Sequence, residues 1–111
     1  MKLIKAFLHH VKSAQVVDAL ADAGYRNVTL QTVTGMLRPL TESEHAYSTH
    51  ASGLVISEVR LSLVCQDDEV NSVTSIIRRV GRIGPHISGW VYVSPVEQAL
   101  PIGGDDLQEG T

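Results

Sequence analysis

The chain opens with alternating apolar and polar side chains over residues 2–9, which predicts a β-strand with two different faces. Apolar residues then recur at helical spacing until Gly24, a natural helix stop, and Ser13 is the predicted cap of this helix. The helical stripe consists of Val16, Val17, Leu20 and Ala23. A β-branched run over residues 27–34 predicts a second strand. The order is therefore strand, helix, strand.

The same order returns in the second half of the chain. Residues 55–65 predict a strand, and Asp67 and Asp68 are the predicted caps of the helix that follows. Gly81 ends that helix, whose apolar stripe is Val70, Val73, Ile77 and Val80. Residues 90–94 predict a fourth strand. Two such units predict an α+β fold, the ferredoxin-like (βαββαβ) sandwich: a four-stranded antiparallel sheet with both helices on one face.

Two segments lack this periodicity. Residues 35–54 predict a long loop, and loops of this length are usually functional or disordered. His45 and His50 lie in it without an acid or cysteine at ligand spacing, so solvated side chains are favoured over a metal or pH-sensing role. Residues 101–111 are polar and glycine-rich and predict a flexible tail. His9 and His10 are adjacent on the predicted strand, so they should face opposite ways.

Composition narrows the class of protein. A chain of 111 residues with 43% apolar residues fits one globular domain. The net charge of −3 gives no sign of nucleic-acid binding, and no apolar run is long enough to insert into a membrane. With no signal segment visible, we expect a cytoplasmic protein. Cys65 is the single cysteine, which excludes an intrachain disulfide and favours a small core residue.

The predicted sheet leaves one face without helices. Leu3 and Phe7 lie on that face, and a small domain with such an exposed apolar face tends to associate. We therefore expect an oligomer with its sheets packed inward; a monomer with a mixed polar face is the alternative.

The turn over residues 84–90 carries the most informative chemistry. It has the sequence Gly-Pro-His-Ile-Ser-Gly-Trp and lies between a helix and a strand. Glycines and a hydroxyl suit a phosphate held by backbone N–H groups. The turn contains neither lysine nor arginine, so it lacks the cations that a triphosphate requires. The sequence fits two roles for His86 equally well: its ring donates a hydrogen bond to an anion, or it is simply an exposed turn residue.

Six stretches stand in the order and spacing of a known family. They are Met-Lys-Leu-Ile-Lys-Ala-Phe at the start, Val-Asp-Ala-Leu-Ala-Asp-Ala-Gly over 17–24, Thr-Leu-Gln-Thr-Val-Thr-Gly-Met-Leu-Arg over 29–38, Asp-Asp over 67–68, Ile-Ile-Arg over 76–78 and Tyr-Val-Ser-Pro-Val-Glu-Gln-Ala over 92–99. On these stretches the chain resembles the PII signal-transduction family over residues 1–100. The resemblance implies a homotrimer of ferredoxin-like subunits that regulates and does not catalyse. It also implies a T-loop over about residues 36–54 that touches partner proteins, and a B-loop over about residues 82–90.

The resemblance implies that adenine nucleotide binds in clefts between neighbouring subunits. Thr29 and Val64 match residues that hold the adenine, and Leu37 and Arg38 lie at the base of the T-loop, where the family touches nucleotide. The part of the B-loop that wraps the phosphates corresponds to Ile87, Ser88, Gly89 and Trp90.

Several positions depart from the family pattern. Trp90 replaces the B-loop lysine and Ile87 its middle glycine, while the C-terminal basic pair falls at Pro101 and Gly103. Three missing cations lower the preference for ATP unless Arg38, Arg60 or Arg82 compensates, since each charge-assisted phosphate contact is worth about 1.5–3 kcal/mol. We therefore expect ADP or AMP to bind better than ATP.

The residues that handle 2-oxoglutarate are also changed. Pro39 replaces the glutamine used with magnesium, Glu58 replaces the lysine that meets 2-oxoglutarate, and Ala51 replaces the modified tyrosine. The altered B-loop and the shortened basic tail resemble the carboxysome-associated PII-like branch, which binds adenine nucleotide together with bicarbonate and is linked to inorganic-carbon supply. Arg38, Arg60 and His86 are the candidate bicarbonate residues, by charge and position.

The expected function is a non-catalytic regulator of inorganic-carbon uptake or fixation. Its T-loop would contact an unknown target, a bicarbonate transporter or a carboxysome component. Three alternatives stay open: a slow nucleotide hydrolase with Glu58 or His86 as base, a nitrogen-linked regulator of a transporter, and a metal-tolerance or assembly module of the same trimeric architecture.

Overall fold

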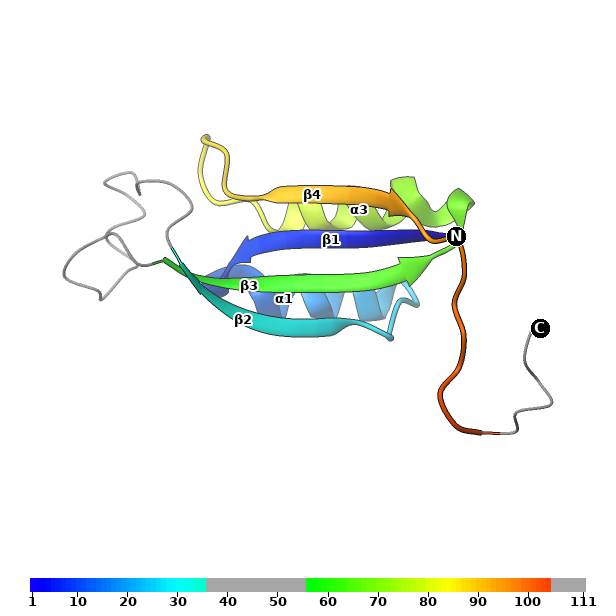
Figure 1. Cartoon of the computed structure of the whole chain (residues 1–111). Coiled ribbons are helices and arrows are strands. Elements are labelled where there is room, and N and C mark those ends of the chain that lie inside the picture. The colour runs from blue at the N-terminus through cyan, green and yellow to red at the C-terminus, as the bar shows by residue number, and fades with distance from the viewer. Residues whose placement is uncertain (36–55, 105–111) are drawn as a thin grey trace.

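The computed structural model describes residues 1–35 and 56–104 and has the predicted α+β architecture. The elements are β1 (Lys2–His9), α1 (His10–Asp22), β2 (Thr29–Gly35), β3 (Ile56–Cys65), the 3-10 helix η1 (Asp67–Glu69), α3 (Val70–Val80) and β4 (Trp90–Pro95). The strands form one sheet in the order β2-β3-β1-β4, and every neighbouring pair is antiparallel. Both helices cover the same face of this sheet (Figure 1), which confirms the ferredoxin-like sandwich.

The core lies between the sheet and the two helices. The stripes predicted from the sequence provide it, because each helix turns its apolar side toward the inward-facing residues of β1 and β3. The largest side chains without solvent contact are Ile4, Val16, Leu20, Leu61, Val73 and Ile77. Ala23 is an exception: it is the exposed C-cap of α1, so its place in the predicted stripe was wrong.

The start of α1 differs from the prediction. The helix begins at His10, and the Nδ1 atom of the buried His9 accepts a hydrogen bond of 3.3 Å from the Val11 N–H. Ser13 lies inside the helix, where its hydroxyl donates to the His10 carbonyl at 2.9 Å. The strand ends between the two histidines, so their rings stack at 4.6 Å and do not point in opposite directions.

Asp67 and Asp68 also do not act as caps. Gln66 is the N-cap of η1, and its backbone N–H donates to a Glu69 carboxylate oxygen at 2.8 Å. The two aspartates follow inside the first turn, and Asp67 accepts a hydrogen bond of 2.5 Å from the amino group of Met1. This hydrogen bond and the charge of the amine lower the pKa of the Asp67 carboxyl. The contact joins β1 to the start of the second helical unit.

Replacing Asp67 by Asn is expected to lower stability at neutral pH and to change its pH dependence. A carboxylate with a lowered pKa stabilises the fold above the ordinary carboxyl pKa of about 4, and this contribution disappears as the pH falls through the lowered pKa. Thermal unfolding of both proteins from pH 7 to pH 2 should give curves that converge in acid. Asp68→Asn is the control. An equal loss of thermal stability in both variants would show that the contact with Met1 does not stabilise the fold.

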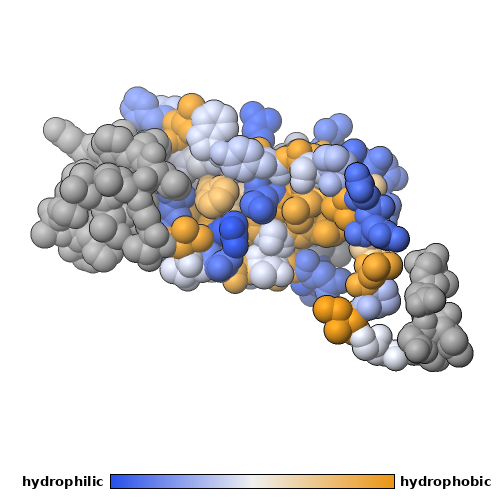
Figure 2. All heavy atoms as spheres, viewed as in Figure 1, coloured by the Kyte–Doolittle hydropathy of each residue, from blue (hydrophilic) through white to orange (hydrophobic). Residues whose placement is uncertain are grey.

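The uncovered face of the sheet carries exposed apolar side chains. Val64, Tyr92 and Trp90 are 48%, 53% and 57% exposed there, and the ring of Phe7 contacts that of Tyr92 edge-on at 6.0 Å. Figure 2 views this face and shows apolar patches between charged groups. The surface has the mixed character of an interface and not that of a fully solvated sheet.

Two segments of interest lie outside the described residues. Residues 36–55 include Leu37, Arg38, Pro39 and the two loop histidines, and residues 105–111 include most of the predicted tail. The T-loop, the tail and the boundary near residue 100 therefore stay predictions. Residues 101–104 are described and exposed, and the chain leaves the body of the domain after β4 (Figure 1). Within the described ranges no helix is long and apolar enough to cross a membrane.

Candidate functional site

The loop between α3 and β4 is closed by its own side chains. The Ser88 hydroxyl accepts a hydrogen bond from the Ile83 N–H and donates to the Ile83 carbonyl, both at 2.9 Å. The Arg82 Nε donates to the Gly84 carbonyl at 2.9 Å, and Gly84 adopts a φ of 64° that favours glycine. Ser88 thus holds the loop in shape, and its hydroxyl is already engaged without any ligand.

The two ends of this loop are pressed against β1 and α3. A Cβ on Gly89 would lie 2.1 Å from the Phe7 carbonyl oxygen, closer than any such atom can approach. A Cβ on Gly81 would lie 2.8 Å from the Ile77 carbonyl oxygen and 3.1 Å from a Leu8 methyl group. Close packing therefore requires glycine at both positions, and the loop is set rigidly against the sheet.

A cleft of about 680 Å³ lies between this loop, α3 and β4. Its inner wall is apolar, with Leu8, Ile77, Val91 and Val93 among its residues. All four predicted B-loop residues, Ile87, Ser88, Gly89 and Trp90, line its other side. The structure therefore brings this part of the predicted site together around one cavity.

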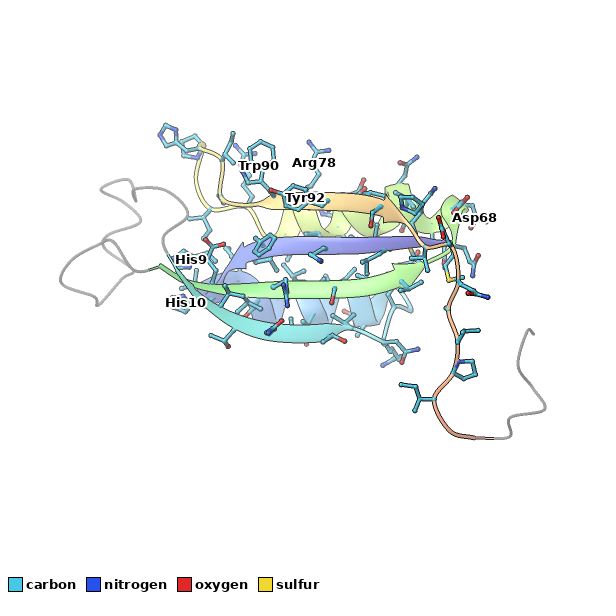
Figure 3. All side chains as sticks on the ribbon, in the orientation of Figure 1. His9, His10, Asp68, Arg78, Trp90 and Tyr92 are labelled. Atoms are coloured by element: carbon cyan, nitrogen blue, oxygen red, sulfur yellow. The ribbon has the colours of Figure 1, made fainter. Side chains whose placement is uncertain are left out.

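The polar groups of the cleft are cationic or neutral. Arg78, Arg82 and His86 line it together with Asn71 and Thr74, and residues 1–35 and 56–104 contribute no carboxylate to its lining. Figure 3 shows Arg78 and Trp90 projecting past the β4 edge of the sheet. Such an arrangement of charge suits an anionic ligand with an apolar part.

From the sequence alone, arginines at the end of a helix are expected to be solvated and to match the helix dipole more often than to contact a ligand, so Arg78 is not among the predicted site residues. Arg79, in the last turn of α3, fits that reading, because it is exposed and does not line the cleft. The spacing in the sequence could have identified Arg78. Asn71, Thr74 and Arg78 follow one another at intervals of three and four residues, so they share one face of the helix. The sequence does not show that β4 lies opposite this helix face.

The predicted adenine residues lie elsewhere on the sheet. Thr29 pairs with Ser62, and Val64 lies two residues farther along β3, so both occupy the uncovered face. Val64 is opposite Leu3 and Trp90 is opposite Phe7, a separation of four residues, or about 13 Å along the strands. Two interstrand spacings add about 10 Å across the sheet. A single chain therefore does not bring the adenine and phosphate groups together.

The candidate bicarbonate residues are also separated. Arg60 lies on the uncovered face, opposite Phe7, and its guanidinium donates a hydrogen bond to the Gln31 side-chain oxygen. His86 lines the cleft, which Arg60 does not, and Arg38 is outside the described residues. Glu58 pairs with His9 in the register of β1 and β3, at the end of the sheet from which residues 36–55 depart.

Cys65 and the histidines give no second site in the described part of the chain. The Cys65 thiol is buried in the core, as expected, and burial raises its pKa, so it is a poor nucleophile at neutral pH. Residues 1–35 and 56–104 hold no cluster of three side chains suited to a metal ion.

Comparison with known proteins agrees with the fold. The family model "Nitrogen regulatory protein P-II" matches residues 1–105. The chain is 31% identical to "Nitrogen regulatory protein P-II" of Porphyra purpurea over 107 residues, which cover 96% of both chains. It is 30% identical to "Nitrogen fixation nifHD region GlnB-like protein 1" of Methanobacterium ivanovii over 103 residues, 92% of this chain and 93% of the relative. The chain therefore belongs to the nitrogen regulatory protein P-II family, whose members are regulatory signalling proteins.

Proposed function

We propose that this protein is a homotrimeric regulator that binds adenine nucleotide between two subunits. The observation that carries the proposal is the separation of the two half-sites. Loop residues 87–90 line a cleft at one end of the sheet, whereas Thr29 and Val64 lie on the uncovered face two and four residues along the strands from the level of Trp90, and on other strands. A second copy, packed against the uncovered face, supplies the missing half. The exposed Tyr92 and Trp90 support such packing, because burial of their rings stabilises an interface.

The proposed nucleotide loop lies at the same end of the sheet as the two strand ends that flank the predicted T-loop. β2 ends at Gly35 and β3 begins at Ile56, which pair with each other at the end of the sheet where β1 meets Trp90. Residues 36–55 therefore leave the sheet near the nucleotide loop. Nucleotide that binds one loop conformation more tightly shifts the population of that conformation and thereby the affinity for a protein target.

The ligand set that we propose is ADP or AMP in preference to ATP, together with bicarbonate. Trp90, Pro101 and Gly103 cannot supply the cations that a third phosphate needs. The Glu58 carboxylate disfavours a dicarboxylate such as 2-oxoglutarate near the base of the T-loop. Arg38, Arg60 and His86 are the proposed bicarbonate groups, to be gathered at the subunit boundary, and the proposed pathway is inorganic-carbon uptake or fixation.

A nitrogen-linked regulator of a transporter is the second candidate function. It is favoured by the names of the relatives, which include a P-II protein and a protein of a nitrogen-fixation gene region. The two candidates differ in the second ligand: the carbon-linked regulator responds to bicarbonate, and the nitrogen-linked regulator responds to 2-oxoglutarate.

Calorimetric titration tests the proposal directly. We expect ADP and AMP to bind at least tenfold more tightly than ATP, since each missing phosphate contact is worth more than the 1.4 kcal/mol of a tenfold change. Bicarbonate should tighten nucleotide binding, and nucleotide should tighten bicarbonate binding by the same factor.

Three results would contradict parts of this proposal. ATP as the tightest ligand, with a further gain from magnesium and 2-oxoglutarate, would replace the carbon-linked function by the nitrogen-linked one. Absence of binding by every adenine nucleotide would remove the nucleotide site altogether. Release of phosphate from ADP or ATP during the titration would support a hydrolase.

A further inference from the structure

We infer that Arg78 and Arg82 of one chain hold the phosphates of bound ADP or AMP. This inference rests on the proposed nucleotide site and adds its phosphate-binding residues. Its basis is the cleft beside residues 87–90, which these two guanidinium groups share with the loop.

The two arginines approach the cleft from one side. Arg78 lies on the face of α3 that also presents Thr74 and Asn71, and Arg82 follows the end of the helix. The hydrogen bond from the Arg82 Nε to the Gly84 carbonyl fixes the direction of that side chain. Arg82 therefore acts as an anchored cation at the start of the loop, and Arg78 as a second cation one helical turn earlier.

The charge of the cleft favours a ligand of opposite sign. Among the described residues, its lining carries two arginines and His86 and no acidic side chain. The carbonyl end of α3 points toward the same region, and the partial negative charge of a helix C-terminus repels an anion. The guanidinium groups of Arg78 and Arg82 offset that repulsion and so favour a phosphate there.

Shape and chemistry favour a phosphate ester over a small free anion. The volume of about 680 Å³ far exceeds that of one inorganic ion, and the wall of Leu8, Ile77, Val91 and Val93 suits an apolar group. Guanidinium groups bind phosphate oxygens in pairs of parallel hydrogen bonds. The Ser88 hydroxyl is occupied within the loop by the N–H and the carbonyl of Ile83, so the guanidinium groups carry the proposed phosphate contacts.

The test compares Arg78→Gln with Arg79→Gln, which removes the same charge from the same helix turn outside the cleft. Each variant and the parent protein are titrated with adenosine, AMP and ADP at two salt concentrations. We expect Arg78→Gln to weaken ADP at least tenfold, AMP less, and adenosine within twofold, and Arg79→Gln to change none of them beyond twofold. Arg82→Lys keeps the positive charge but loses the paired N–H donors of the guanidinium group, and should weaken ADP binding severalfold.

The outcomes separate this inference from the proposed site. If the parent protein binds ADP and Arg78→Gln binds it equally well, the arginines are not phosphate ligands and the nucleotide site stands. If Arg78→Gln weakens adenosine as much as ADP, the effect is on folding or assembly, and the inference fails. If the parent protein binds neither AMP nor ADP, the proposed function fails, and the inference with it.

Discussion

Replacing Gly89 with alanine is expected to lower the melting temperature by roughly 5–20 °C and to abolish nucleotide binding. The added Cβ would lie 2.1 Å from the Phe7 carbonyl oxygen, and this oxygen belongs to a central strand that cannot move away. Forcing a methyl group into a packed site costs about 1–3 kcal/mol, and one kcal/mol shifts the melting temperature of a domain of this size by about 4–8 °C. The loop must detach from β1, and the cleft then loses its wall.

Gly84→Ala is the matched control for this experiment. It adds the same methyl group to the same loop, but the new Cβ would meet no atom within 4 Å. Its cost is that of a φ of 64° in a residue with a side chain, about 1 kcal/mol. Thermal unfolding is measured at one protein concentration, because assembly contributes to stability. Equal melting temperatures for the two variants would show that the Phe7 contact does not require glycine.

Leu3→Asp is expected to convert the proposed trimer into single chains. Leu3 lies on the uncovered face of β1, a central strand, between Val64 on one side and Ser94 on the other. A carboxylate buried there between subunits, without a partner, costs several kcal/mol per copy, and three copies meet in one assembly. Light scattering coupled to size-exclusion chromatography should give the mass of a single chain instead of the mass of three chains. Nucleotide binding should fall with it, because each site needs two subunits.

Val11→Asp provides the comparison for the assembly experiment. Val11 is 40% exposed in the first turn of α1, on the helix layer, where an added negative charge suits the helix N-terminus. This variant should remain a trimer and keep its affinity for ADP. A Leu3→Asp protein that is still a trimer would place the subunit interface on another surface of the domain.

The arrangement of helices and strands was largely readable from the pattern of side chains. Each predicted strand and helix is present, with ends that shift by a few residues at most, because alternation and helical spacing report directly which side of an element is buried. The cap of α1 was predicted incorrectly, since capping by His9 depends on where the strand ends and not on a preferred residue type. The resemblance to the PII family, carried by six short stretches, led to the same family that the comparisons identify.

The candidate site was predictable only in part. The segment over residues 84–89, with a glycine at each end, predicted a phosphate-binding turn, and the sequence also showed that this turn contains no lysine or arginine. Arg78 stands twelve positions before Trp90, and no periodicity in the sequence joins a helix face to the strand that follows a loop. The structure joins them in one cleft.

By itself, the sequence determined the fold class, the buried stripes and the position of a turn with backbone donors and no charge of its own, because these properties depend on local spacing. The tertiary structure alone decided what surrounds that turn. It placed Gly89 against the Phe7 carbonyl, turned Arg78 toward the cleft and Arg79 away from it, and set Thr29 and Val64 apart from the loop. These contacts join residues that are distant in the chain, and they depend on the register of β1 with its neighbours and on the packing of α3 across the sheet.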